Sequence, residues 1–132
     1  MKNQSLGILI IRLSLGILML LHGIAKLSQG VAGIENMLES KGIPGFVAYG
    51  VYIGEVIAPL LLIVGYRTRI AAILLFLNML VIVFIAHPEN LLSVSSHGGW
   101  KMELAGLYLF GSLALIFMGG GDYALSSKNK WD

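Results

Sequence analysis

The stretch that decides the fold is Gly50–Leu75, GVYIGEVIAPLLLIVGYRTRIAAILL. It places one carboxylate, Glu55, inside an apolar run, and Pro59 follows four residues later. A polar turn at Tyr66–Arg69 then opens a second apolar run. An unpaired carboxylate is costly to bury, and a carboxylate inside a membrane span faces a partner within a helix bundle. The stretch therefore predicts two membrane spans joined by a tight polar turn.

The composition of the whole chain agrees with a membrane protein. Of 132 residues, 57% are hydrophobic and 12% are charged, and the mean hydropathy is +0.85. A soluble domain carries about 25% charged residues, so water is a poor solvent for this chain. The length predicts a single domain, residues 1–132. No cysteine is present, which excludes disulfides and iron–sulfur clusters held by the chain's own thiolates.

Four apolar runs predict an all-α, polytopic membrane four-helix bundle. Each run meets the length of about 17–25 residues that a helical span requires. The predicted spans cover residues 6–27, 46–65, 70–86 and 100–118. Between the first two spans, apolar residues share one helical face and Gly42 supplies a stop, which predicts a short interfacial helix. The residues of that face are Val31, Ile34, Met37 and Leu38.

The net charge is only +2, and the basic residues are scattered, so we interpret them as topology signals rather than as a nucleic-acid surface. The amino end, the 66–69 turn and the tail hold five of them: Lys2, Arg67, Arg69, Lys128 and Lys130. The other connections hold fewer, and acidic residues dilute them: Lys26, Lys41 and Lys101 with Glu35, Glu39 and Glu89. Both termini are therefore expected in the cytoplasm.

Two polar residues inside the first two spans are expected to form a structural ion pair. Counted at about 1.5 Å per residue from the cytoplasmic side, Arg12 and Glu55 lie within reach of a long arginine side chain. A buried ion pair fixes helix order and needs no catalytic role. Pro59 removes the hydrogen bond normally made to the carbonyl of Glu55, which predicts a kink. Asn78 is expected to bond between helices.

A second group of polar residues is expected near the outer face: His22, Lys26, His87 and Glu103. They are candidates for lining a ligand-binding pocket, and glycine notches at Gly16 and Gly23 would leave room there for a ring. The competing interpretation is that the four satisfy one another in a water-filled vestibule, or that Lys26 extends to the headgroups. Their spacing does not predict a metal site.

Several motifs together resemble the DoxX family of small membrane proteins: RLSLGILMLLHGIAKL, KGIPG, GEVIAPLLLIVGYRTRIAAILL, His87 and GGGDYALS. The resemblance runs from about residue 12 to 126. It implies a four-span inner-membrane protein, and some relatives are subunits of quinone-linked oxidoreductases. The family positions are Arg12, His22, Lys26, Glu55, Pro59, Thr68 and Arg69. The closing motif departs from the family, because Ala124 and Ser126 stand where a Ser and an Asp are usual.

Two function classes remain open. The first is a redox-associated membrane subunit that binds a quinone and works with a partner that supplies the electrons; at most it is a quinone-binding or non-catalytic subunit of an oxidoreductase. The second is a binding or assembly protein that recognises another membrane protein through glycine-rich faces and outer loops; a homo-oligomer is also left open. A transporter is less favoured, because no inverted repeat is visible. The expected partners are the lipid bilayer and a membrane or redox protein, with no nucleic acid.

Overall fold

The computed structural model describes residues 2–132, and the predicted all-α fold is confirmed. Within this range there is no β-strand; a single antiparallel bridge joins Val94 and Trp100. The α-helices are α1 (Lys2–Gln29), α2 (Ala32–Ser40), α3 (Gly50–Tyr52), α4 (Ala58–Val64), α5 (Thr68–Val81) and α6 (Glu103–Met118). The 3₁₀ turns are η1 (Gly45–Tyr49) and η4 (Pro88–Asn90), and the π-helical turns are η2 (Ile53–Ile57) and η3 (Ile82–Ala86).

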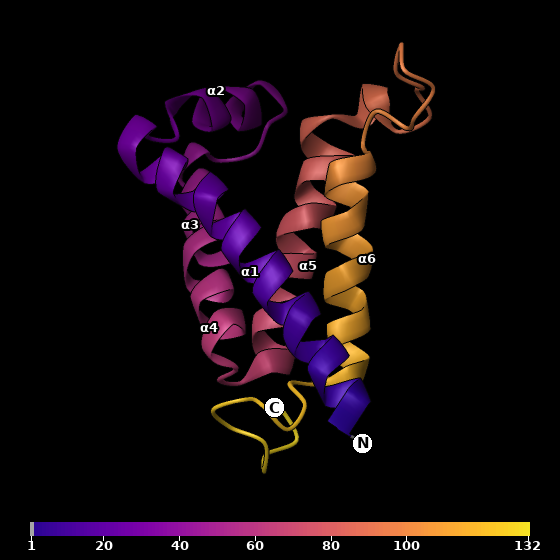
Figure 1. The fold of residues 1–132 in the computed structure, drawn as a ribbon. Coiled ribbons are helices and arrows are strands. Elements are labelled where there is room, and N and C mark those ends of the chain that lie inside the picture. The colour runs from indigo at the N-terminus through magenta and orange to yellow at the C-terminus, as the bar shows by residue number, and fades with distance from the viewer. Residues whose placement is uncertain (1) are drawn as a thin grey trace.

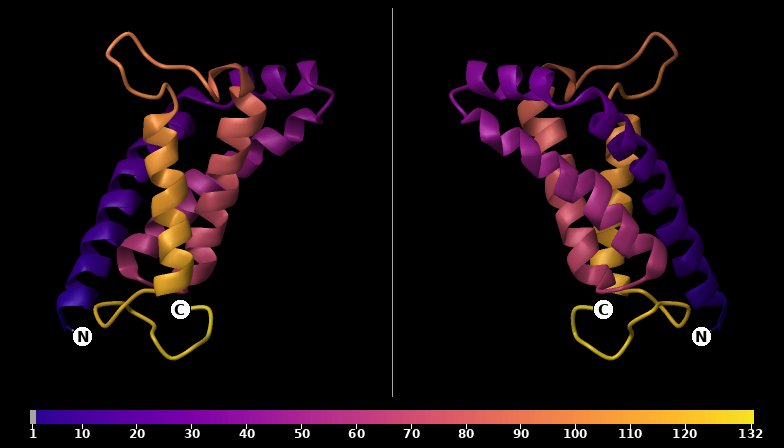
Figure 2. Two further views of the ribbon diagram at one scale, coloured as in Figure 1. Left: turned by 90° about the vertical axis from the view of Figure 1, so that its right-hand side faces the viewer. Right: turned by 90° about the vertical axis from the view of Figure 1, so that its left-hand side faces the viewer.

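These elements form four helical columns that pack side by side (Figure 1). The columns are α1, the continuous run η1–α3–η2–α4, the run α5–η3, and α6. Both ends of the chain lie at one end of the columns, here called the terminal end (Figures 1 and 2). Helix α2 and the connection 87–102 lie at the opposite end, here called the loop end. Helix α2 crosses the loop end instead of running along the columns.

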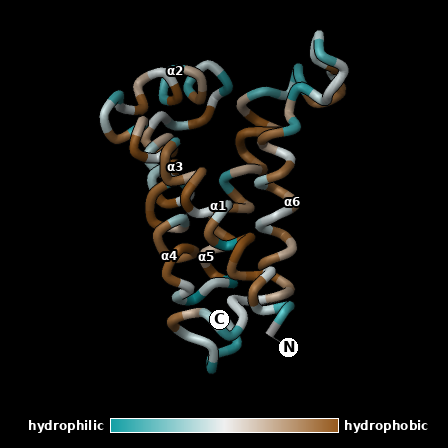
Figure 3. The backbone as a smooth tube through the Cα atoms, in the orientation of Figure 1, coloured by the Kyte–Doolittle hydropathy of each residue, from teal (hydrophilic) through white to brown (hydrophobic). Residues whose placement is uncertain are grey.

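Three of the columns are long and apolar enough to cross a membrane. They cover Asn3–Gln29, Gly45–Val64 and Thr68–Ala86, close to the first three predicted spans. Helix α6 is a shorter apolar helix of 16 residues, because the chain turns at residues 100–102 before the helix begins. Hydrophobic residues run along all the columns, and polar residues gather at the two ends (Figure 3). Large apolar side chains such as Leu21 and Leu107 are exposed on the outside, as expected of a surface in contact with lipid.

The interior contains two apolar clusters. The larger one joins the columns and includes the fully buried Leu62, Leu75 and Leu115. The smaller one packs α2 against η1 and α3; its buried residues are Val31, Leu38, Ala48 and Val51. The helix predicted in the first connection is therefore present, and its apolar face is covered by the protein itself.

The second column is irregular next to Pro59. Proline has no N–H group and leaves the carbonyl four residues earlier, that of Glu55, without its usual helical partner. The chain forms the π-helical turn η2 immediately before Ala58 and Pro59; such turns are frequent at functional sites. The Glu55 carbonyl lies against Gly23 of α1, where a Cβ atom would overlap it. Helix α1 can approach η2 closely only because residue 23 is glycine.

We expect Gly23→Ala to destabilise the protein by about 1–3 kcal/mol, because the added methyl group meets backbone atoms that cannot rotate away. Gly7→Ala is the matched control on the same helix, since a Cβ atom at Gly7 meets nothing within 4 Å. The measurement is the free energy of unfolding in detergent. Equal stabilities for the two variants would contradict the close approach of α1 and η2.

Candidate functional site

Three polar side chains from three columns meet inside the molecule. The Lys26 ammonium of α1 lies 2.5 Å from Glu55 Oε1 of η2, and the Asn78 amide of α5 donates to Glu55 Oε2 at 3.0 Å. The Glu55 side chain is 1% exposed and that of Lys26 is 27% exposed. We call these three residues the Glu55 cluster. Each carboxylate oxygen has a donor, so the buried charge is paired and hydrogen-bonded.

The structure does not bring Arg12 and Glu55 together, so the predicted ion pair is wrong. Side chains on a helix tilt toward its N-terminus, and the N-terminus of α1 is at the terminal end. Arg12 therefore reaches away from Glu55. For the same reason Lys26, which the sequence placed near the outer face, reaches back from the loop end to Glu55.

Arg12 is fully buried beside the last turn of α4. Its guanidinium donates to the carbonyl of Leu62 at 3.1 Å and to the carbonyl of Tyr123 at 2.8 Å. The C-terminus of a helix carries partial negative charge and has free carbonyl groups. The guanidinium cation of Arg12 thus lies at the C-terminal end of α4, and its bond to Tyr123 fastens the tail to the columns.

The Glu55 cluster forms the polar part of a groove of about 630 Å³. The groove lies between the second column and α5–η3, with α2 contributing residues from the loop end; we call it the lateral groove. Its apolar lining includes Ile34, Met37, Val51, Leu74, Leu77 and Val81. Its polar lining residues are the three of the Glu55 cluster and His87. Its volume falls within the range of about 300–1,000 Å³ that is usual for small-molecule sites, and an apolar lining with a few polar groups is also typical.

The structure divides the predicted outer pocket. Lys26 and His87 both line the lateral groove, and His22 and Glu103 do not. His22 is exposed and packs edge-on against Tyr108 of α6, with ring centroids 6.3 Å apart. Glu103 is exposed at the start of α6, next to Gly99.

The predicted glycine notches are filled by the protein itself. A Cβ atom at Gly16 would meet Ile63 and the carbonyl of Pro59, and Gly23 lies against Glu55. Neither position leaves room for a ligand ring. These glycines serve to pack α1 tightly against the second column.

Asn78 makes the interhelical bond that its mid-span position predicted, but its place in the lining of a groove was not predicted. The part of α2 that lines the groove, including Ile34 and Met37, was also missed as a site. Their apolar spacing predicted one face of an interfacial helix and could not show what that face borders. Within residues 2–132, no three His, Asp or Glu side chains are grouped so that they could hold a metal ion.

The predicted kink and turn residues lie toward the terminal end of the second column and in the first turn of α5. Pro59 is buried below η2. Thr68 is fully buried at the start of α5, and among the described residues its hydroxyl has no hydrogen-bond partner. Arg69 donates from its guanidinium to the carbonyl of Ile116 and from its backbone to the carbonyl of Trp131. These bonds of Arg69 therefore join the first turn of α5 to the end of α6 and to the tail.

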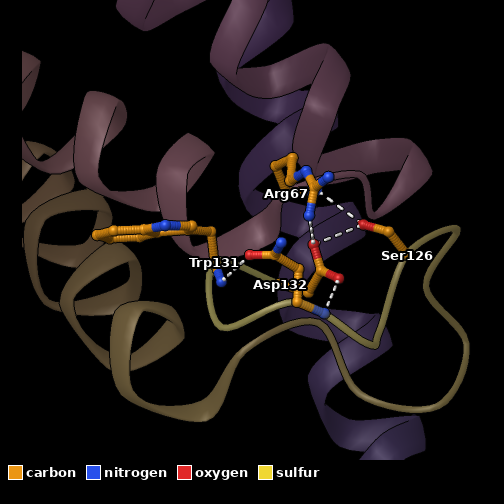
Figure 4. A network of polar contacts seen from close by, with 5 residues as sticks. Arg67, Ser126, Trp131 and Asp132 are labelled. Atoms are coloured by element: carbon orange, nitrogen blue, oxygen red, sulfur yellow. Dashed lines mark hydrogen bonds and ion pairs between the residues drawn. The ribbon is translucent and has the colours of Figure 1, made fainter.

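The tail covers the terminal end and is held by a polar network (Figure 4). Asp132 Oδ1 accepts from the Ser126 hydroxyl at 2.8 Å and lies 3.3 Å from the Arg67 guanidinium. Burial raises the pKa of Asp132, but hydrogen bonds from Asn129 and Ser126 and the charge of Arg67 together bring this pKa below its ordinary value. The carboxylate is thus the favoured form. Ser126 stands where the family motif usually has an Asp, and its hydroxyl takes part in the network that holds the tail.

Comparisons with known proteins agree with this architecture. The family model DoxX matches residues 7–88. The chain is 34% identical over 79 residues to "Putative oxidoreductase CatD" of Bacillus subtilis, an alignment that spans 60% of this chain and 58% of that protein. It is 32% identical over 121 residues to an "Uncharacterized protein" of Haemophilus influenzae, covering 89% of this chain and 87% of that one.

A third relative matches over nearly its whole length. It is "Inner membrane protein YqjF" of Escherichia coli, 29% identical over 133 residues, with 98% of each chain covered. No solved structure matches the chain. The family match covers more than half of the chain, and three columns are long and apolar enough to cross a membrane. The chain is a membrane protein of the DoxX family.

Proposed function

We propose that this protein is a quinone-binding subunit of a membrane oxidoreductase and that a partner protein supplies the electrons. The observation that carries the proposal is the lateral groove, in which apolar walls surround the polar Glu55 cluster. A relative named as an oxidoreductase supports the redox setting.

The groove residues fit a quinone head group. A quinone ring is flat and apolar, and its two carbonyl oxygens are hydrogen-bond acceptors. An ammonium group has three donors and an amide nitrogen has two, so Lys26 and Asn78 each retain donor capacity after bonding Glu55. In this proposal they donate to a quinone oxygen, and Glu55 holds both donors in place. A bound quinone would supply reversible electron and proton transfer.

His87 marks the loop end of the groove. Its side chain is 52% exposed, and its Nδ1 lies 3.7 Å from the Glu89 carboxylate. An imidazole is the side chain suited to taking and giving protons near neutral pH. In the proposed function, His87 exchanges protons between the groove and the solution at the loop end.

The test is saturable binding of a short-chain quinone to the purified protein in lipid nanodiscs. Gly50 lines the groove, and a Cβ atom there meets nothing within 4 Å. Gly50→Leu should therefore add bulk at the groove lining and weaken binding about tenfold or more. Gly7→Leu adds the same side chain to open space on α1 and should leave binding unchanged.

A second variant tests the polar contacts. Asn78→Leu removes one proposed donor and leaves Lys26 to pair with Glu55. A lost hydrogen bond costs about 0.5–1.5 kcal/mol, so affinity should fall several-fold. If wild-type protein binds no quinone, or if Gly50→Leu and Gly7→Leu bind equally well, the quinone proposal is wrong.

The alternative is a binding or assembly factor that recognises its partner through glycine-rich faces and outer loops. Gly16 and Gly23 pack against the second column, and Gly54 lies against Asn78 of α5. These three glycines are therefore occupied within the chain, whereas a Cβ atom at Gly50 would meet nothing within 4 Å.

We further propose an inner-membrane location with both termini in the cytoplasm, α6 as a fourth span, and α2 in the outer interface. A relative is named as an inner membrane protein, and the basic residues favour this orientation. The absence of cysteine permits a direct test with single cysteines at Asn3, Ser95 and Ser127. An impermeant thiol reagent applied to intact cells should label only Ser95→Cys. Labelling at the other two positions but not at residue 95 would show the opposite orientation, with both termini outside.

A further inference from the structure

The lateral groove has a mouth on the apolar outside of the columns. Four of its lining residues are also large apolar residues exposed on the surface: Val47 at 42%, Ile53 at 44%, Leu77 at 51% and Val81 at 40%. We call these four the lateral rim. Two belong to the second column and two to α5, so the rim borders the groove on both sides.

The rim lies within the spanning segments and not beyond them. All four residues fall inside Gly45–Val64 or Thr68–Ala86. Leu77 directly precedes Asn78, and Ile53 lies two residues before Glu55. A molecule that passes between these side chains would meet the Glu55 cluster at nearly the same depth. It would not have to leave the hydrocarbon first.

The groove has a second side, toward the loop end. Gly33 of α2 and His87 line it there, and both are exposed. A water-soluble ligand would use this route. The two routes differ in the polarity of the side chains that border them, because the rim is wholly apolar and the loop end carries a histidine. Only the rim suits a ligand that is dissolved in lipid.

We infer that the ligand enters sideways from the bilayer through the lateral rim, with its polar head group first. This inference rests on the proposed function and specifies its substrate class: a lipid-dissolved quinone with a hydrocarbon tail. The head group bonds to the Glu55 cluster, and the tail stays between the rim residues and continues into lipid. A hydrocarbon tail contributes to affinity through the apolar surface that it buries against the rim.

The charge balance of the head-group site also suits a neutral ligand. Lys26 and Glu55 compensate each other, so the groove offers donors without an excess of positive charge. A neutral acceptor such as a quinone oxygen fits this environment. An anionic head group would gain no unpaired cation there.

The first experiment blocks each route with a bulky side chain in nanodiscs. Leu77→Trp narrows the rim, Gly33→Trp narrows the loop-end route, and Leu107→Trp adds the same bulk on α6, 69% exposed and away from the groove. The probe is a decyl-tailed quinone delivered in the lipid, and the readout is its association rate. We expect a drop of about tenfold for Leu77→Trp and little change for the other two.

The second experiment does not depend on the folding of any variant. A quinone with a photoreactive group on its tail is bound to wild-type protein in nanodiscs and activated by light, and the labelled peptides are identified by mass spectrometry. Labels should fall on the rim residues of the second column and α5. Excess tail-less quinone should remove them by competing for the head-group site.

The outcomes separate the inference from the proposed function. If the quinone binds and labels fall on residues 87–102, or if Gly33→Trp slows association more than Leu77→Trp, entry is from the loop end. The proposed function then stands and sideways entry is wrong. If neither the tailed nor the tail-less quinone binds, both are overturned.

Discussion

Replacing Lys26 by methionine is expected to lower the free energy of unfolding by about 3–5 kcal/mol, the usual cost of breaking a buried ion pair. Methionine keeps the length of the side chain and removes the charge. Glu55, 1% exposed, would then be left with the Asn78 amide as its remaining hydrogen-bond donor. Thermal and chemical unfolding in detergent measure the loss.

Glu55→Gln should cost less than Lys26→Met. The Lys26 side chain is 27% exposed, so an unpaired ammonium can turn toward the headgroups, whereas an unpaired Glu55 carboxylate cannot leave the interior. The double variant should recover part of the loss, because neither charge remains. Strictly additive losses would mean that Lys26 and Glu55 do not interact.

The matched cycle for Arg12 and Glu55 should give the opposite result. These residues share no hydrogen-bond partner: Arg12 bonds to carbonyls at the terminal end, and Glu55 bonds to Lys26 and Asn78. Distant, independent sites add to within about 0.3–0.5 kcal/mol. A large coupling energy between Arg12 and Glu55 would contradict the structure and support the ion pair predicted from the sequence.

The second large effect is expected at Arg12. Arg12→Met removes two hydrogen bonds from a charged donor, each worth about 1.5–3 kcal/mol, and leaves the carbonyls of Leu62 and Tyr123 without that donor. We expect a loss of about 3–6 kcal/mol in total by the same estimate. The tail should also loosen, because Arg12 fastens Tyr123 to the columns.

Amide hydrogen exchange distinguishes this role from general destabilisation. In Arg12→Met, amides of residues 123–132 should exchange faster than those of α5. Arg67→Met is the control at the same end; its side chain is 33% exposed, so its loss should be smaller and confined to the contact with Asp132. Unchanged protection of the tail in Arg12→Met would contradict the fastening role.

The helices could be predicted because hydrocarbon imposes a simple rule on sequence. A span must be apolar for about 20 residues, and the runs around Leu15, Leu61 and Leu75 meet this rule without reference to tertiary contacts. The run ending at Met118 also predicted a helix, but it placed the start at residue 100, and the helix begins at Glu103. The turn at residues 100–102 depends on contacts that include a Trp100 side chain bonded to the carbonyl of Leu91.

The site was harder to predict, because the depth of a residue along a helix does not show in which direction its side chain extends. Arg12 and Lys26 both lie on α1, and the tilt of side chains toward the N-terminus sends each one nearer the terminal end than its own Cα. The sequence also did not show that His22 and Lys26 contact different columns: His22 packs on α6, and Lys26 bonds to Glu55 of the second column. The lateral groove depends on where α2 folds back, which periodicity does not show.

The lateral groove is proposed to hold a quinone. Its most direct test is to extract the wild-type protein from its native membrane with a mild detergent and measure bound quinone by mass spectrometry, beside the groove-filling variant Gly50→Leu and its control Gly7→Leu. Wild type and Gly7→Leu should carry quinone in a fixed ratio to protein, and Gly50→Leu should lose it. Absence of quinone from wild-type protein, or equal amounts in all three, would contradict the proposal.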